Sequence, residues 1–125
     1  MAGYIAVDLD GTLARYSGWN DGEIGEPIPL MVDRVKNWLA QGREVRIFTA
    51  RVSGEDEPGR QVGYRELIQE WCLTHIGQIL PVTCCKDYGM ITLFDDRAVS
   101  VEPNTGRITT DNWQDLTPGS SHKGV

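Results

Sequence analysis

Two aspartates separated by one residue are the side chains of this sequence whose types and spacing best suit chemistry. Asp8 and Asp10 directly follow the apolar run 4–7, and a Gly-Thr-Leu sequence comes after them. Two carboxylates this close repel each other, and a divalent cation relieves that repulsion. The arrangement therefore predicts a site that binds a divalent metal ion.

Other acidic residues are expected to join this pair. The run 4–7 predicts a short buried strand, which places Asp8 at the carboxyl end where ligands bind in open parallel sheets. Asp95 and Asp96 directly follow another predicted strand at 90–94. We expect Asp8, Asp95 and the backbone carbonyl of Asp10 to bind Mg²⁺, with Asp96 reaching metal-bound water.

The remaining polar residues at predicted strand ends suit phosphate binding. Thr49, Ala50 and Arg51 follow a predicted strand at 44–48, and Lys86 follows one at 79–84. Thr49 and Lys86 offer a hydroxyl and an ammonium group to phosphate oxygens, and Ala50 and Arg51 extend this predicted phosphate-binding set. For Arg51 two roles stay open, because it can contact substrate or pair with the surplus acidic groups.

The segments between these residues predict the elements that position them. Apolar residues at helical spacing predict helices at 30–41 and 61–76, each ended by a glycine. The order strand, helix, strand, helix, strand, strand predicts a three-layer α/β fold with a mainly parallel sheet. Residues 14–29, here called the flap, predict an irregular loop, and residues 98–110 predict a C-terminal β-hairpin.

Length and composition predict one compact domain. The chain has 125 residues, and we expect a single domain over 1–116 and a flexible tail at 117–125. No apolar run approaches the roughly 20 residues of a membrane helix. The odd number of cysteines, three, favours free thiols, so we expect a cytoplasmic protein without a membrane partner. The formal net charge of −6 argues against tight non-specific binding to nucleic acid.

Taken in order, the motif at 8–13, Thr49, Lys86 and the Asp95-Asp96 pair resemble the four motifs of the haloacid dehalogenase (HAD) superfamily. The resemblance spans residues 4–97 and implies a Rossmann-like core and an Mg²⁺-dependent phosphatase. It implies that Asp8 is a nucleophile that forms an aspartyl-phosphate. It also implies that Asp10 protonates the leaving oxygen and then activates water. Asp10 favours phosphate chemistry, because halide departure needs no proton and the dehalogenase branch typically lacks this second aspartate.

The chain departs from the family pattern in two ways. The gap between Lys86 and Asp95 has no room for the helix that carries the lysine in many relatives, and no cap domain is predicted. A capless site is open, which suits a large substrate or a lid supplied by an oligomer partner.

The expected partner is a phosphorylated small molecule or a nucleic-acid end. Ala14 and the Asp-Asp-Arg triplet at 95–97 are similar to the phosphatase half of polynucleotide kinase-phosphatases. This resemblance makes a nucleotide or a nucleic-acid 3′-phosphate end the first candidate substrate. The alternatives are a phosphotransferase of the same fold and a non-catalytic phosphate-binding module.

Overall fold

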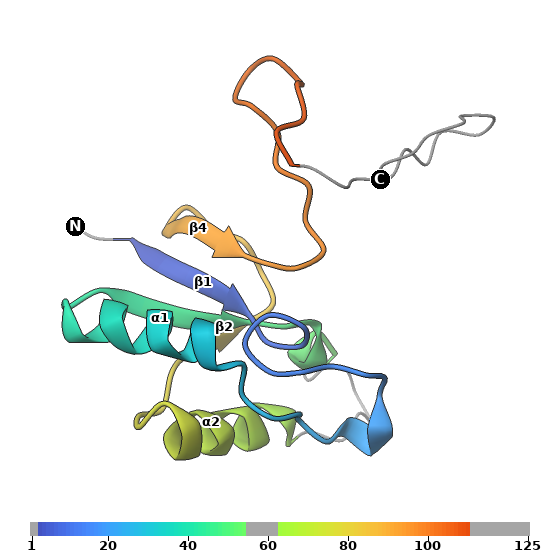
Figure 1. Cartoon of the computed structure of the whole chain (residues 1–125), viewed down its shortest axis with the longest axis vertical. Helices are drawn as coiled ribbons and strands as arrows, with labels where there is room; N and C mark the ends of the chain where they lie inside the picture. Colours follow the sequence, from blue (N-terminus) through green and yellow to red (C-terminus); the bar gives the residue numbers. More distant parts are fainter. Residues whose placement is uncertain (1–2, 55–62, 111–125) are drawn as a thin grey trace.

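The computed structural model describes residues 3–54 and 63–110, and its elements follow the predicted order. The strands are β1 (Tyr4–Asp8), β2 (Glu44–Phe48), β3 (Val82–Thr83) and β4 (Met90–Phe94), and the helices are α1 (Pro29–Ala40) and α2 (Tyr64–His75) (Figure 1). Two short 3-10 turns complete the set: the flap turn (Asn20–Gly22) and η2 (Ala50–Val52). The predicted bounds of β2 and β4 are confirmed, whereas β3 is shorter than predicted.

The four strands form one parallel sheet in the order β3-β2-β1-β4. In this register Val7 of β1 pairs with Ile47 of β2 on one side and with Phe94 of β4 on the other. The carboxyl ends of these three strands therefore lie side by side. The predicted α/β architecture with a parallel sheet is confirmed, and the residues that follow β1, β2 and β4 meet at one edge.

β3 is an edge strand, and Pro81 directly precedes it. Proline has no N–H to donate to a ladder, so regular pairing with β2 is limited to Val82 and Thr83. The strand ends at Thr83, whose hydroxyl oxygen accepts a hydrogen bond from the Cys85 N–H at 3.1 Å and so turns the chain.

Both helices pack against the same face of the sheet (Figure 1). Alternate residues of β1 and β2 form the sheet side of this core, and residues about one helical turn apart form the helix side. The buried members include Ile5, Val7, Val45 and Ile47 from the strands, Met31, Val32 and Val35 from α1, and Ile68, Trp71 and Cys72 from α2. The described residues thus form two layers, and the prediction of three is wrong for this part of the chain.

The missing third layer has a simple physical cause. Residues 84–89 join β3 at one edge of the sheet to β4 at the other, and this segment is too short for a crossover helix. It is anchored to β1 instead, because the buried Tyr4 donates its hydroxyl to Asp87 at 3.0 Å. The Arg46 guanidinium lies 3.9 Å from the centre of the Tyr4 ring. Burial and the bond to Asp87 raise the pKa of Tyr4 above its ordinary value.

The predicted C-terminal hairpin is present as a short antiparallel arm. Val101 and Ile108 form an antiparallel bridge, and the Glu102 N–H donates to the Arg107 carbonyl at 2.7 Å. Figure 1 shows this arm extending away from the sheet. The predicted tail at 117–125 lies outside the described residues, as does the predicted start of the second helix at 61–62. Within the described part of the chain, no helix is long and apolar enough to cross a bilayer.

Candidate functional site

The loop after β1 fixes the two aspartates by burying the leucines beside them. Leu9 and Leu13 are fully buried in the core, and the Leu9 carbonyl accepts the N–H of Leu13 at 3.0 Å and that of Ala14 at 2.9 Å. The polar residues between these two anchors, which include Asp10, are half-buried at the surface. Alternation of apolar anchors and carboxylates thus presents Asp8 and Asp10 at the edge of the sheet.

Asp8, Asp95 and Asp96, here called the acidic cluster, each offer a carboxylate oxygen, and these oxygens lie within 4.8 Å of one another. The Thr12 hydroxyl links two of the three, at 3.0 Å from Asp96 Oδ1 and 3.4 Å from Asp8 Oδ2. Its oxygen also accepts the Asp96 N–H at 3.0 Å. The structure therefore brings together three of the four predicted metal-binding residues.

Gly11 makes this close approach possible. Its backbone has φ +90°, and a Cβ at this position would lie 2.5 Å from Asp96 Oδ2. An L-residue would be strained by the backbone angle and would also displace the Asp96 carboxylate. The glycine of the first motif is thus required by the contact between the β1 loop and the end of β4.

The electrostatics of the acidic cluster fit a divalent cation. The pKa of Asp8 is raised to about 7, first because burial disfavours its charged form, then because of a hydrogen bond with Asp96. The negative charges of Asp95, Asp96 and Asp10 raise it further. A hard cation would favour the ionised forms of these carboxylates, and oxygen ligands are the donor set that Mg²⁺ prefers. The residues present therefore fit the predicted metal.

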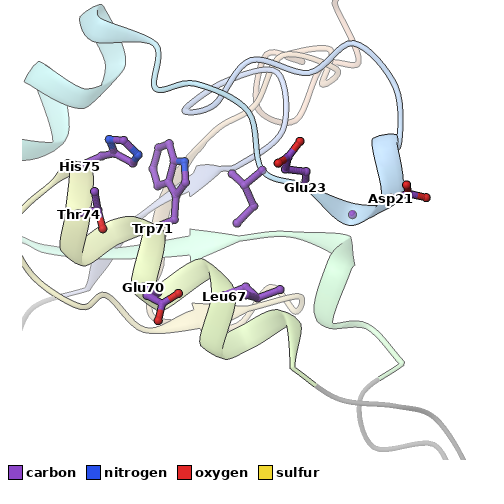
Figure 2. A pocket seen from close by; sticks show the side chains of 9 residues that line it. Asp21, Glu23, Leu67, Glu70, Trp71, Thr74 and His75 are labelled. Carbon is purple, nitrogen blue, oxygen red and sulfur yellow. The ribbon is translucent and has the colours of Figure 1, made fainter.

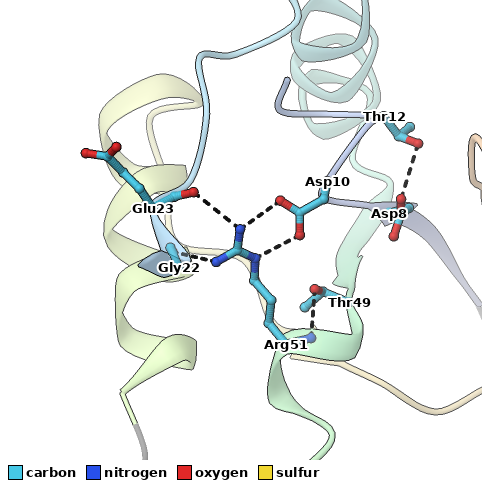
Figure 3. Close-up of polar contacts among 7 residues, drawn as sticks. All are labelled: Asp8, Asp10, Thr12, Gly22, Glu23, Thr49 and Arg51. Atoms are coloured by element: carbon cyan, nitrogen blue, oxygen red, sulfur yellow. Dashed lines mark hydrogen bonds and ion pairs between the residues drawn. The ribbon is translucent and has the colours of Figure 1, made fainter. Parts of the chain in front are cut away.

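Asp10 is not part of the acidic cluster; its carboxylate points toward Arg51, with which it forms a bidentate ion pair (Figure 3). Arg51 Nε donates to Asp10 Oδ2 at 2.8 Å, and Nη2 donates to Oδ1 at 2.9 Å. The Arg51 side chain is only 4% exposed, against 21% for Asp10. Of the two roles left open for Arg51, the structure shows pairing with an acidic residue.

Thr49 and Ala50 lie where the end of β2 turns into η2. Thr49 is 2% exposed, and its hydroxyl oxygen accepts the Arg51 N–H at 3.1 Å, which caps the turn. This bond uses a lone pair of the oxygen and not the hydroxyl hydrogen, which can still be donated to an anion. Ala50 is exposed at the start of the same turn.

A cavity of about 720 Å³ connects these residues. It is lined by the predicted residues Asp8, Asp10, Thr49, Ala50, Arg51 and Asp96, and also by Tyr16, Trp19, Tyr64 and Arg97. Lys86 is exposed and is not among the described residues that line the cavity, so its role as a phosphate ligand stays a prediction. Asp95 belongs to the acidic cluster but does not line the cavity.

Tyr64 is a lining residue that the sequence patterns did not indicate as part of the site. It lies within the helix predicted at 61–76 and packs partly against the core. As the first residue of α2, however, it also reaches the cavity, where its ring meets Trp19 edge-on with 5.8 Å between centroids. The sequence feature that could have indicated this role is the position of the tyrosine in the first turn of a predicted helix, directly after a loop.

A second cavity of about 580 Å³ is lined by residues 21–24 of the flap and by residues of α2 (Figure 2). Asp21, Glu23, Glu70, Trp71 and His75 are among its lining residues. None of the predicted site residues lines this cavity. It depends on the docking of the flap against α2, which the sequence pattern did not specify.

Comparison with known proteins supports the fold and assigns no function. A solved structure from Bacteroides thetaiotaomicron, titled as a conserved protein coded by locus, is similar with a TM-score of 0.55 and 21% sequence identity, over 78% of each chain. No protein-family model and no curated protein matches this chain. At this identity the likeness shows the α/β fold alone.

Proposed function

We propose that the protein is an Mg²⁺-dependent phosphomonoesterase of the HAD type that works through an aspartyl-phosphate on Asp8. The observation that carries the proposal is the juxtaposition of the acidic cluster with Asp10 and Thr49 at the carboxyl edge of a parallel sheet. The order of the motifs along the chain supports it, because the same residues resemble those of HAD phosphatases. The role of the acidic cluster would be to bind Mg²⁺, which supplies positive charge against the phosphate oxygens.

The chain's own residues divide the reaction into two steps. In the first, a carboxylate oxygen of Asp8 attacks phosphorus, the bond between phosphorus and the ester oxygen breaks, and Asp10 gives a proton to the departing oxygen. In the second, Asp10 takes a proton from water, which attacks the aspartyl-phosphate. Inorganic phosphate leaves, and the Asp8 carboxylate is regenerated.

Thr49 and its neighbours are proposed to orient the phosphate. The Thr49 hydroxyl can donate to a phosphate oxygen, and the exposed Ala50 beside it leaves room for the anion. Lys86 is proposed as the ammonium group of the site on the strength of the motif resemblance. Arg51 is less suited to phosphate than predicted, because its guanidinium donates to Asp10 and to two backbone carbonyls.

The substrate class that the cavity favours is a nucleotide or a nucleic-acid 3′-phosphate end. Tyr16 and Trp19 are 51% and 48% exposed, and together with Tyr64 they form an aromatic wall of the cavity. Exposed aromatic rings next to a phosphate site can stack on a base. Arg97 lines the same cavity and can neutralise a second phosphate.

The test is a phosphate-release screen with Mg²⁺ across mononucleotides, 3′-phosphorylated dinucleotides and sugar phosphates, with Asp8→Asn as the blank. We expect turnover of the nucleotide substrates by the wild type and none above background by Asp8→Asn. Normal turnover by Asp8→Asn contradicts the aspartyl-phosphate, and activity on sugar phosphates alone contradicts the substrate class. Transfer to added glycerol in preference to water indicates the phosphotransferase, and phosphate binding without turnover indicates the non-catalytic module.

A further inference from the structure

We propose that Arg51 is a positioning residue that holds the Asp10 carboxylate for proton transfer and makes this geometry depend on a closed flap. The inference rests on the proposed function, since it assigns a residue that acts through the acid and base of that reaction. It goes beyond the prediction that Arg51 binds phosphate.

The first observation is the geometry of the ion pair. The two contacts of 2.8 Å and 2.9 Å fix the plane and the direction of the Asp10 carboxylate. A single donor would leave the carboxylate free to rotate. The Arg51 side chain is almost fully buried, and its own backbone N–H is tied to Thr49 at 3.1 Å. The guanidinium is therefore a fixed reference point for Asp10.

The second observation is that the same guanidinium holds the flap turn. Nη1 donates to the Gly22 carbonyl at 2.6 Å and Nη2 to the Glu23 carbonyl at 3.4 Å (Figure 3). Its central carbon also lies 4.8 Å from the centre of the Trp19 ring. If the flap moved away, these contacts would be lost and a buried cation would be left with fewer partners. The positions of Asp10 and of the flap are thus linked through one side chain.

The third observation is that the flap is fixed from its other side by α2. Trp71 of α2 donates its indole N–H to the Gly25 carbonyl at 3.0 Å. Trp71 and residues of the flap turn line the second cavity (Figure 2), and Asp10 is not among its lining residues. A change at Trp71 can therefore loosen the flap without touching the residues of the proposed reaction.

The ion pair is compatible with both roles of Asp10. A neutral carboxylic acid keeps one oxygen as an acceptor while the other carries the proton, so Arg51 can retain one of its two contacts during the first step. Once the proton has passed to the leaving oxygen, both oxygens of Asp10 can accept again. In the bidentate geometry of the structure, both Asp10 oxygens accept hydrogen bonds from Arg51.

The experiment compares two phosphate esters that differ in their need for a proton. A mononucleotide releases an alkoxide that must be protonated, whereas 2,4-dinitrophenyl phosphate releases a stable phenolate. For Arg51→Lys, which keeps the charge and loses the planar fork, we expect kcat to fall by about 100-fold on the mononucleotide, within the range for general acid catalysis. On the dinitrophenyl ester we expect formation of the aspartyl-phosphate to change by less than about threefold. Asp10→Asn should show the same selectivity.

Two further variants help to distinguish a loss of Asp10 positioning from a general loss of folding. Arg43→Lys, at the exposed residue before β2, is the matched control and should leave both rates unchanged. Trp71→Phe removes the donor to Gly25 and replaces the buried indole by a smaller phenyl ring, so its folding is checked by thermal unfolding. We expect a loss of about two- to tenfold on the mononucleotide alone, the size of one hydrogen bond. Equal losses on both esters, or no loss on either, would overturn the positioning role of Arg51. A wild type that hydrolyses neither ester contradicts the proposed function itself, and the inference with it.

Discussion

The protonation of Asp8 gives the metal-free protein a specific dependence on pH. Its pKa is about 7 in the folded state against an ordinary value of 3.8 for an aspartate, so the folded state binds the proton more tightly than the unfolded state. The resulting stabilisation is fully present below about pH 3.8 and is lost as the pH rises through about 7. We therefore expect Asp8 to contribute to the melting temperature in chelator, and this contribution should decrease as the pH is raised from about 3.8 to about 7.

Asp8→Asn isolates that contribution, because asparagine cannot ionise. The melting temperature of Asp8→Asn minus that of the wild type should increase from pH 5 to pH 8 in chelator, measured by thermal unfolding. Mg²⁺ should stabilise the wild type more at the higher pH, where the metal need not compete with a proton. A difference between the two proteins that is constant with pH would contradict the raised pKa of Asp8.

Gly11→Ala tests the contact between the β1 loop and Asp96. The added methyl group would collide with the Asp96 carboxylate, and the positive φ would be strained. We expect a stability loss of about 1–2 kcal/mol and a clear loss of Mg²⁺ affinity, measured by urea unfolding and by titration calorimetry. Gly42→Ala is the control, since Gly42 has φ +82° and open space around its Cβ. It should lose similar stability and keep its Mg²⁺ affinity.

At the scale of residues, the sequence predicted which residues lie at the site better than which side chains contact one another. The motif spacing placed Asp8, Asp95 and Asp96 at neighbouring strand ends, and their oxygens do meet. It could not decide what Arg51 contacts, because the flap turn that supplies two of its acceptors is an irregular segment without periodicity. The bidentate contact with Asp10 depends on where that turn lies in space.

At the scale of elements, the prediction of three layers failed, because the short connection at 84–89 joins β3 to β4 without a helix. Strands and helices with clear periodicity were found within a few residues of their actual bounds, as β2 and β4 show. The number of layers depends instead on which edges of the sheet β3 and β4 occupy. That order is set by packing between distant segments, such as the bond between Tyr4 and Asp87, and a local pattern does not contain it.

The packing of β4 against α1 supports the position of the acidic cluster. Phe94 is partly buried against the core, and its ring lies 4.9 Å from that of Trp38. Phe94→Ala should cost about 2 kcal/mol, less than the roughly 3–5 kcal/mol for a fully buried phenylalanine. Because Asp95 and Asp96 directly follow Phe94, Mg²⁺ affinity should also fall.

Ile91→Ala is the matched control on the same strand. Ile91 is 57% exposed, so its truncation should change the free energy of unfolding by less than about 0.5 kcal/mol. Both variants can be compared by urea unfolding and by Mg²⁺ titration. Equal Mg²⁺ affinities for Phe94→Ala and Ile91→Ala would show that the acidic cluster does not depend on this contact.

At the scale of the whole molecule, net charge and an open cavity act in opposite directions on a nucleic-acid substrate. In the proposed function a chain end would enter the cavity beside the aromatic wall, where Tyr16 and Trp19 are 51% and 48% exposed. The formal charge of −6 repels the rest of a polyanion. These two features predict that the terminal nucleotides are bound and that additional length weakens binding.

Oligonucleotides with a 3′-phosphate can separate these effects through their dependence on salt. At about 0.02 M NaCl, we expect kcat/KM to fall by about twofold or more from a dinucleotide to a 20-mer, because the longer chain adds repulsion. Raising NaCl to about 0.2 M shortens the Debye length from roughly 20 Å to roughly 7 Å and should remove this difference. A protein that binds the phosphate backbone of the nucleic acid through basic residues would prefer the longer chain at low salt, since salt weakens such binding. A 20-mer that is preferred at low salt and loses that preference at high salt would contradict this prediction. It would show that a local basic surface outweighs the net charge, and Arg97, which lines the cavity, would be the first residue to replace.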